Sequence, residues 1–393
     1  MFATGSKQIV IVGAGFGGLA AARRLRKLMP AAEITLVAPV DEFQYLPSLI
    51  WIPTGLRDGA ELRLRFTPLL TRLCVRYVEA LATGLDPAGR KLHTTKGDIA
   101  YDGLIIASGG AWLKKLPGAM GLHGVCEGVD AAQAVRARLL DLAKAGKGRI
   151  ALSFATNPQE QGAMRGGPVF EMLFGLDTWL RREKLRERFE LTFFHASNAP
   201  GQRLGEQAVE VLLGRMAQKG IRTVLGKKPV GFEDQDVLLD SGERIESDLT
   251  LLVPGMRGQD WFANTGLELS PGGFVKADDM CRTSAEGVYV VGDAGSFPGP
   301  DWLPKQAHMA DLQAVAAAQN LADALQGRTP HHKPRVELVC IVDSLDAGVL
   351  VWRTPKRSFL FASRLLHPAK RLFEWYYLRD LRSAAAKFPA AGA

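Results

Sequence analysis

The sequence of 393 residues predicts an α/β protein with two parallel sheets. A glycine-rich turn near the N-terminus joins a β-branched run to a run rich in Ala, Leu and Arg. Two continuous apolar runs, far apart in the chain, are typical of parallel strands covered on both faces. The stretch between them alternates strand and helix patterns of its own. The expected fold class is therefore two Rossmann-like dinucleotide-binding domains, the second inserted in the first, with a C-terminal amphipathic segment.

The N-terminal elements form a βαβ unit. Residues 7–12 predict a strand, residues 16–29 a helix and residues 34–37 a second strand. The apolar runs at 101–109 and 287–293 predict two further strands of the same sheet.

The inserted stretch predicts a second parallel sheet. Strands are expected at 148–154, 190–195 and 249–253, and helices at 168–186 and 205–219. No other internal repeat is visible.

These elements give three domains. Residues 1–111 and 273–330 form the first domain, whose last helix is expected at 305–325. Residues 112–272 form the second domain. A polar hinge then leads into a C-terminal segment, residues 331–393, of different composition.

Composition excludes several classes of protein. With 47% hydrophobic and 23% charged residues, the chain is neither disordered nor fibrous. Four scattered cysteines without a CxxC pair argue against a disulfide scaffold or a CxxC-type zinc centre, so a reducing compartment is expected. No secretory signal and no apolar run long enough to cross a membrane are visible.

The glycine turn has the pattern of a phosphate-binding loop. Gly13 turns the chain, Gly15 lets the backbone approach a pyrophosphate, and Gly18 lets the helix pack close to the strand, with Phe16 and Gly17 between them. The pyrophosphate then lies at the helix N-terminus, where free N–H groups favour an anion. The alternative is a fortuitous glycine turn.

Two further motifs resemble those of flavoproteins with two dinucleotide-binding domains. Residues 283–293 end in Gly292 and Asp293, and the resemblance implies that this aspartate binds the ribityl chain of FAD. Ala107, Ser108 and Gly109 resemble the ATG-like turn of the same proteins. FAD is therefore the expected cofactor. Other residues expected to contact it are Pro47, Ala80, Pro304 and Lys305.

The inner domain lacks the corresponding glycines. The strand at 148–154 continues into residues 155–161 without a GxGxxG pattern. Close approach of the backbone to a second pyrophosphate is not provided, which argues against NAD(P)H as the electron donor.

Longer segments resemble the sulfide:quinone oxidoreductase family. They are residues 36–48 with Trp51, residues 302–305 and residues 373–378. The resemblance implies that sulfide attacks a redox-active cysteine, that its sulfur joins a growing polysulfide, and that the electrons pass through FAD to a quinone in the membrane.

The resemblance assigns catalytic residues and shows one departure. Cys340 matches the C-terminal cysteine of the family's pair, and Cys126 matches a cysteine found in some members. Glu171 is a candidate proton relay, but residues 163–167 before it lack the other paired cysteine. A pair of Cys126 with Cys340 is one substitute. The alternative is that both are small buried apolar residues.

Lys305 stands at the expected start of the helix at 305–325. The functional interpretation is an ammonium group near the flavin pyrimidine edge, where negative charge collects on reduction. The alternative is a solvated lysine in the first turn of the helix.

The tail from residue 359 predicts two short amphipathic helices broken at Pro368. Residues 351–393 hold nine Lys and Arg against two acidic residues, so they carry most of the net charge of +8. This localised charge favours an anionic membrane surface over nucleic acid. Phe359, Phe373 and Tyr376 are the expected quinone or membrane contacts. The alternative is a helix pair that caps a domain or forms a dimer.

The sequence thus predicts a peripheral FAD enzyme on the cytoplasmic side of the cell membrane that oxidises sulfide and reduces quinone. One alternative is a type II NADH:quinone oxidoreductase, which the missing cysteine leaves open. Another is a flavin-binding redox sensor without turnover. Assembly into a homo-oligomer stays open.

Overall fold

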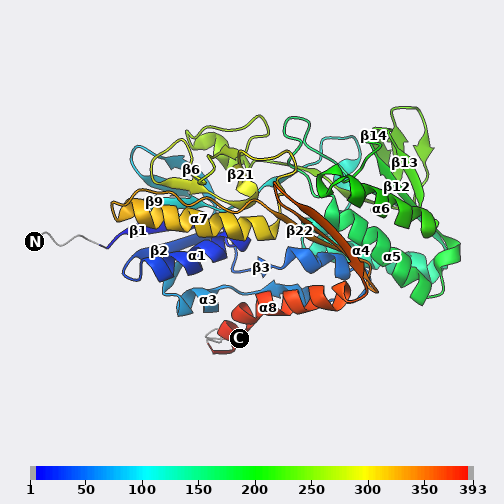
Figure 1. The fold of residues 1–393 in the computed structure, drawn as a ribbon, viewed down its shortest axis with the longest axis horizontal. Coiled ribbons are helices and arrows are strands. Elements are labelled where there is room, and N and C mark those ends of the chain that lie inside the picture. Colours follow the sequence, from blue (N-terminus) through cyan, green and yellow to red (C-terminus); the bar gives the residue numbers. More distant parts are fainter. Residues whose placement is uncertain (1–5, 388–393) are drawn as a thin grey trace, which may run out of the picture.

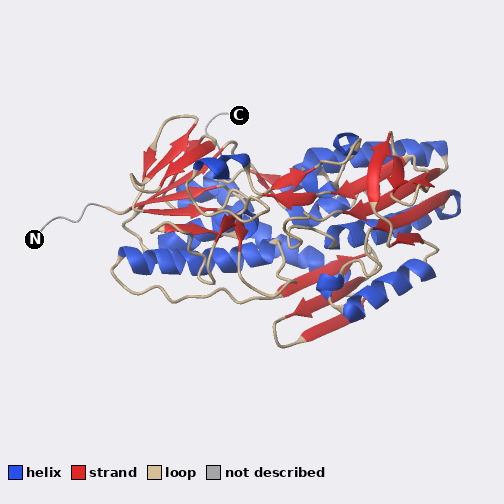
Figure 2. Cartoon of the chain, turned by 90° about the horizontal axis from the view of Figure 1, so that it is seen from above, coloured by secondary structure: helices blue, strands red, loops and turns tan. Residues whose placement is uncertain are grey.

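A computed structural model describes residues 6–387. Two α/β units lie side by side along the long axis of the molecule, and the C-terminal strands and helix α8 lie across both of them (Figure 1). Seen from above, each unit contains strands with helices packed against them (Figure 2). The predicted fold class is confirmed, whereas the predicted domain boundaries stay a prediction.

The first unit holds a five-stranded parallel sheet in the order β20-β9-β1-β2-β5. Its strands are β1 (Gln8–Val12), β2 (Glu33–Ala38), β5 (Val75–Glu79), β9 (Gly103–Ile106) and β20 (Val288–Val290). The two distant apolar runs therefore join the N-terminal βαβ unit, as predicted.

Two long helices cover one face of this sheet (Figure 1). They are α1 (Phe16–Leu28) and α7 (Ala307–Leu325). The small sheet of β6 (Ala82–Asp86), β7 (Lys91–Thr94) and β8 (Ile99–Ala100) contributes Leu85 and Leu92 to the cluster on the opposite face. Both faces are thus buried, which explains the continuous apolar pattern.

The inner unit holds a four-stranded parallel sheet in the order β13-β12-β11-β17. These strands are β11 (Gly148–Phe154), β12 (Phe189–His195), β13 (Arg222–Leu225) and β17 (Leu249–Val253). The helices of this unit are α4 (Val129–Ala145), α5 (Gly167–Arg182) and α6 (Glu206–Gln218). Helix α5 ends four residues before the predicted end, because Lys184 takes a left-handed conformation with φ 60°.

The remaining strands and α-helices of both units are short. They are β3 (Phe43–Gln44), α2 (Gly59–Leu62), β4 (Arg63–Leu64), α3 (Thr67–Arg72), β10 (Ala111–Leu113), β14 (Pro229–Glu233), β15 (Asp236–Leu239), β16 (Arg244–Ile245), β18 (Gly255–Arg257), β19 (Val275–Lys276) and β21 (Gly295–Ser296).

The C-terminal segment corrects one prediction. It forms an antiparallel sheet of β22 (Leu338–Asp343), β23 (Gly348–Arg353) and β24 (Ser358–Ser363), followed by α8 (Leu366–Lys387). The prediction of two short helices is wrong. Residues 358–363 pair with β23 instead, and Pro368 lies in the first turn of α8, where its missing N–H interrupts no helical hydrogen bond.

Helix α8 packs onto the first unit with one face. Leu378 and Leu381 are buried in the same cluster as α1 and α7, and the Tyr377 ring lies 5.1 Å from that of Phe16. Among residues 6–387, no helix is long and apolar enough to cross a membrane.

Candidate active site

The glycine turn between β1 and α1 has the shape of a phosphate cradle. A Cβ atom at Gly13 would overlap the Ala107 carbonyl, and one at Gly18 would overlap the Gly13 carbonyl oxygen. A Cβ atom at Gly15 would meet nothing within 4 Å. The turn is therefore closed toward the protein and open at Gly15, which leaves room for an anion at the N-terminus of α1.

The neighbouring turn after β9 supplies a free polar group. The Ser108 hydroxyl is buried and has no hydrogen-bond partner among the described residues. Gly109 has φ +71°, and a Cβ atom there would also meet open space. An unsatisfied buried hydroxyl is costly, so a polar ligand at this turn accounts for both features. The site fits the FAD that the motifs predict.

The other predicted cofactor residues surround this region or support it. Ala80 donates its backbone N–H to the Ala38 carbonyl at the end of β2, and Ala107 donates its own to Val12. Pro47 lies in the first turn of a 3-10 helix. The ring of Phe16 packs against Tyr377, so its side chain serves the core.

Asp293 follows β20 and faces an arginine that the sequence did not single out. Its carboxylate forms a partly buried ion pair with Arg165 of the inner unit. The neighbouring Gly292 has φ +65° and donates its backbone N–H to Oε1 of Gln313 at 2.9 Å. Arg165 lies in the segment where the family resemblance places the missing cysteine. The guanidinium also lies 5.5 Å from the centre of the Trp112 ring.

Lys305 lies beside this ion pair, but the helix does not begin there. Helix α7 starts at Ala307, so the prediction that Lys305 starts it is wrong by two residues. The ammonium donates to the Gly295 carbonyl at 2.7 Å and lies 4.0 Å from the centre of the Phe274 ring. Burial lowers the pKa of Lys305, while Asp293 opposes that shift. With Asp293 and Pro304, it lines a cavity of about 1800 Å³.

The two predicted cysteines lie in one apolar cluster. Cys126 belongs to a 3-10 helix at Val125–Glu127, and Cys340 lies in the middle of β22. Both are free thiols, so the structure does not contain the disulfide that would replace the lost pair. Burial raises the pKa of Cys126 to about 11 and that of Cys340 to about 12.

Cys340 faces the N-terminus of helix α5. A Cβ atom at Gly167, the first residue of this helix, would lie 3.4 Å from the Cys340 sulfur. The positive end of a helix stabilises a thiolate, and this effect opposes the pKa increase caused by burial. The helix end that binds a pyrophosphate in a nucleotide-binding unit therefore meets a thiol here.

Glu171 lies one turn further along α5, on the same face as Gly167. Its buried carboxyl pairs with Lys370 of α8 and accepts the backbone N–H of Asp343 at 3.2 Å. Burial raises the pKa of Glu171 to about 7, against the opposing effect of Lys370. A carboxyl with this pKa can accept and release a proton near neutral pH.

A second carboxylate extends this cluster toward the first unit. Asp343 accepts the Trp51 indole N–H at 2.7 Å and lies 2.9 Å from His367 Nδ1. Sequence reasoning missed Lys370, Asp343 and His367. Lys370 was visible only as one basic residue of the tail, and no spacing shows that it reaches a carboxyl 199 residues away.

The connection from β11 to α5 lacks the glycine turn of the first unit, and its residues 155–162 line the cavity of about 1800 Å³. It spans residues 155–166, and a Cβ atom at Gly166 would lie 2.9 Å from the Phe154 ring. Pro168 removes one N–H donor from the first turn of α5. The Phe154 ring therefore packs against Gly166, the residue before the first turn of α5.

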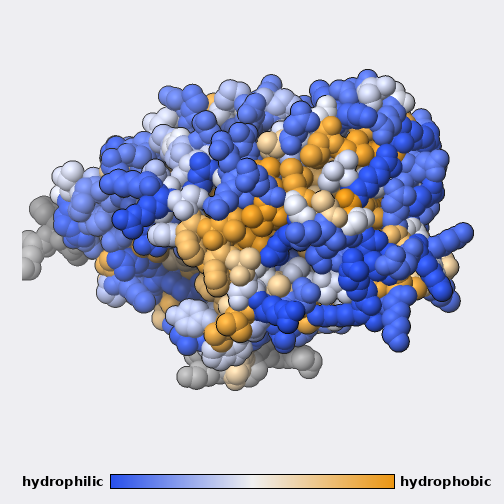
Figure 3. All heavy atoms as spheres, turned by 45° about the vertical axis from the view of Figure 1, so that its right-hand side comes forward, coloured by the Kyte–Doolittle hydropathy of each residue, from blue (hydrophilic) through white to orange (hydrophobic). Residues whose placement is uncertain are grey.

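The predicted membrane contacts lie on the surface. Phe359, Phe373 and Tyr376 are 51%, 58% and 57% exposed, the first on β24 and the others on α8. Figure 3 shows apolar side chains in patches that polar and charged side chains border.

A family model described as pyridine nucleotide-disulphide oxidoreductase matches residues 7–314. The chain belongs to this family. Pyridine nucleotide-disulphide oxidoreductases of this kind are flavoproteins that bind FAD, so the FAD prediction is confirmed and the chain is a flavin-dependent oxidoreductase.

Named relatives within the family agree with the predicted resemblance. The sulfide-quinone reductase of Aquifex aeolicus is 24% identical over 411 aligned residues, covering 96% of this chain and 92% of the relative. A type II NADH:quinone oxidoreductase of Staphylococcus aureus is 21% identical, covering 89% and 90%.

Solved structures show the same fold. The X-ray structure of the Aquifex aeolicus sulfide:quinone oxidoreductase superposes with a TM-score of 0.88 at 22% identity, covering 96% of this chain and 92% of that one. A structure of NDH2 from Plasmodium falciparum superposes with a TM-score of 0.75 at 10% identity, covering 98% of each.

Proposed function

We propose that this flavoprotein oxidises sulfide at Cys340 and reduces a membrane quinone. The observation that carries the proposal is the position of the Cys340 thiol at the N-terminus of α5, one turn from Glu171. A sulfur centre is required because only sulfur both accepts sulfane sulfur and leaves as a thiolate. Bound FAD supplies the two-electron redox chemistry.

The chain's own residues handle the sulfur and the proton. Hydrosulfide gives up two electrons and one proton, and its sulfur remains on Cys340 as a persulfide. The α5 N-terminus and the Lys370 ammonium favour the thiolate form before the attack and the persulfide anion after it. Glu171 accepts the proton. The quinone takes up the two electrons and two protons, so the whole reaction consumes one proton.

Cys126 and Arg165 have secondary roles in this proposal. Cys126 lies in the same apolar cluster as Cys340 and is proposed as a second carrier of sulfur. The Arg165 guanidinium lowers the pKa of Cys126 against the effect of burial and holds Asp293 for the cofactor. Arg165 thus connects the sulfur side of the site with the flavin side.

The quinone is proposed to enter from a membrane surface. Phe359 of β24 and Phe373 and Tyr376 of α8 are exposed aromatic side chains, and the guanidinium of Arg379 lies 4.3 Å from the centre of the Tyr376 ring. Aromatic rings beside basic groups suit the interface of an anionic bilayer. We place this surface on the cytoplasmic side of the cell membrane.

A type II NADH:quinone oxidoreductase is the second candidate. Relatives with that name align over most of the chain. In addition, the segment around Arg165 lacks one cysteine of the pair that carries sulfur in the sulfide:quinone oxidoreductase family. The missing glycine turn before α5 argues against it, because the connection offers no GxGxxG pattern for a second pyrophosphate. A flavin-binding redox sensor would share the cofactor site and show no turnover.

The variant Cys340→Ser tests the sulfur step. With FAD still bound, sulfide-driven flavin bleaching under anaerobic conditions should fall at least about 100-fold, because a hydroxyl cannot hold sulfane sulfur. Cys74→Ser is the matched control, since Cys74 is an exposed free thiol. Equal rates in both variants would remove Cys340 from the reaction.

A further inference from the structure

The segment that follows α7 folds back along this helix and brings two histidines to a carboxylate. One ligand atom from each of Asp323, His331 and His332 lies within 4.8 Å of the other two. Asp323 belongs to the last turns of α7, and both histidines belong to the hinge after it. Two imidazoles and one carboxylate form a donor set that suits zinc and other late first-row divalent metals.

The backbone of His332 is fixed before any metal binds. The buried side chain of Asn320, one turn before Asp323 on α7, donates to the His332 carbonyl at 2.7 Å and accepts its N–H at 2.8 Å. His332 therefore has a defined place against the helix. Its Nε2 lies 3.1 Å from Oδ2 of Asp323. When two ligand atoms each lie about 2.0–2.1 Å from one metal ion, they lie about 3 Å from each other. The spacing of His332 Nε2 and Asp323 Oδ2 therefore suits two ligands of one ion.

The carboxylate and the second histidine are oriented as well. Arg328 donates twice to Oδ1 of Asp323, at 2.6 and 2.8 Å, and leaves Oδ2 for the metal. His331 Nδ1 lies 3.2 Å from the Thr329 carbonyl, which leaves Nε2 as the ligand atom. In metal-binding histidines, the ring nitrogen that does not bind the metal usually donates a hydrogen bond to a carbonyl or a carboxylate. The two imidazole rings lie 4.1 Å apart.

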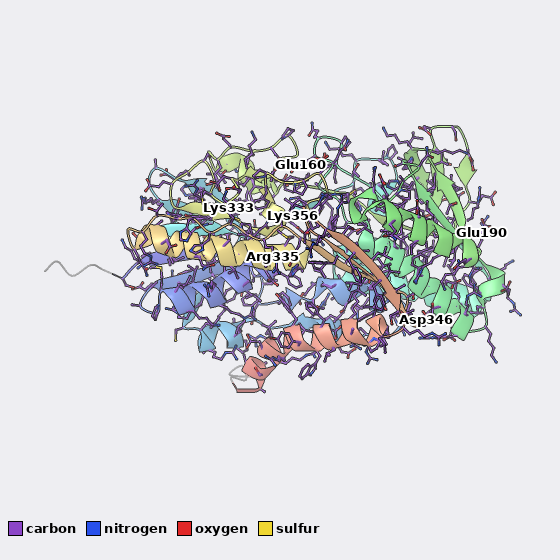
Figure 4. The ribbon with its side chains drawn as sticks, in the orientation of Figure 1. Glu160, Glu190, Lys333, Arg335, Asp346 and Lys356 are labelled. Carbon is purple, nitrogen blue, oxygen red and sulfur yellow. The ribbon has the colours of Figure 1, made fainter. Side chains whose placement is uncertain are left out.

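We propose that Asp323, His331 and His332 bind one Zn²⁺ ion, with water in the open position. The ion would fasten the start of the hinge to the end of α7. From there the segment runs back beside α7, with Lys333 and Arg335 along it (Figure 4), until Glu337 meets His308 at the other end of the helix. The next residues begin β22, the strand that carries Cys340, so the site fixes one end of the connection to the sulfur site.

Nearby cations do not block the site. Arg328 is bound to the oxygen that the metal does not use, Lys333 pairs with Asp279, and Arg335 pairs with Glu337. His331 is exposed, so an ion can enter from solvent.

Isothermal titration of the untagged, FAD-loaded protein with ZnCl₂, after removal of metals with EDTA, tests the proposal. One site per chain is expected, and His331→Ala and His332→Ala should each weaken it roughly 10- to 100-fold or more. His93→Ala is the matched control, because His93 forms a surface pair with Asp98 alone. A wild-type protein without saturable binding, or binding that survives in the double variant His331→Ala/His332→Ala, would overturn the site.

Tryptic cleavage after Arg328 gives a second readout that is independent of affinity. Zn²⁺ should slow this cleavage several-fold in the wild type and leave it unchanged in the double variant. Flavin absorbance and thermal unfolding of each variant show that the fold is kept. Equal protection by Zn²⁺ in wild type and double variant would contradict the site.

Discussion

The N-termini of helices α1 and α5 occupy equivalent places in two parallel sheets and meet different partners. At α1, three residues after β1 form a glycine turn that is closed toward the protein and open at Gly15. At α5, residues 155–166 intervene, the Phe154 ring packs against Gly166, and the Cys340 thiol faces Gly167. The positive end of a helix is thus a general anion site, and the connection before it selects a phosphate or a sulfur.

The largest effect is expected from a substitution in the glycine turn before α1. In Gly18→Ala, the new Cβ atom meets the Gly13 carbonyl oxygen, so the turn must open and most of the FAD should be lost. The ratio of flavin absorbance to protein measures this loss. Gly214→Ala is the matched control, because Gly214 lies in helix α6 and a Cβ atom there meets nothing within 4 Å. Full FAD content in Gly18→Ala would mean that the turn does not hold the cofactor.

The next effect breaks the connection between the two sides. Arg165→Gln removes the partner of the partly buried Asp293 carboxylate and should lower the free energy of unfolding by about 1–3 kcal/mol, because the carboxylate loses its charged hydrogen-bond donor. Urea unfolding of the FAD-loaded protein measures the change. Arg244→Gln, which breaks an exposed ion pair, serves as the control and should leave stability nearly unchanged. If both variants are equally stable, Arg165 does not connect the two sides.

The pH dependence of stability tests the raised pKa of Glu171 on α5. Burial raises the pKa of Glu171 from 4.5 to about 7, so between these values the folded protein holds a proton that the unfolded chain has released. The contribution of Glu171 to stability therefore decreases as pH rises from about 4.5 to about 7, and is constant above that. Glu171→Gln should remove this slope in urea unfolding at pH 5 and pH 7.5. Glu286→Gln, at an exposed position, should keep the slope, and an unchanged slope in Glu171→Gln would contradict the assignment.

The smallest effect concerns the exposed side of α8. Phe373→Ser should reduce binding to anionic liposomes several-fold in a flotation assay, with FAD content unchanged. Met120→Ser removes another exposed apolar side chain, in the inner unit, and should leave binding unchanged. Equal binding of both variants would mean that α8 does not face the membrane.

The α1 side could be predicted from sequence because its signals are local. The spacing of Gly13, Gly15 and Gly18 sets a backbone conformation within one turn, and the apolar runs that become β9 and β20 show their burial directly. The missing glycines after β11 were equally visible. Both observations depend on residues that are neighbours in the chain.

The α5 side could be predicted only in part, because its partners are distant in sequence. Cys340 and Glu171 were named through family motifs, but Lys370 reaches Glu171, and Arg165 reaches Asp293, only through tertiary packing. The prediction of two helices in the C-terminal tail was wrong for a related reason. In residues 358–363, apolar and polar side chains alternate only weakly, and the aromatic residues suggested a helix. The segment is a strand because it pairs with β23.

Anaerobic mixing of the oxidised holoenzyme with sulfide, and separately with NADH, tests the central claim most directly. If the α5 N-terminus serves a thiol and not a dinucleotide, sulfide should bleach the flavin absorbance within the mixing experiment, and NADH at the same concentration should not. Rapid bleaching by NADH, with none by sulfide, would contradict the account and identify the inner unit as a dinucleotide site.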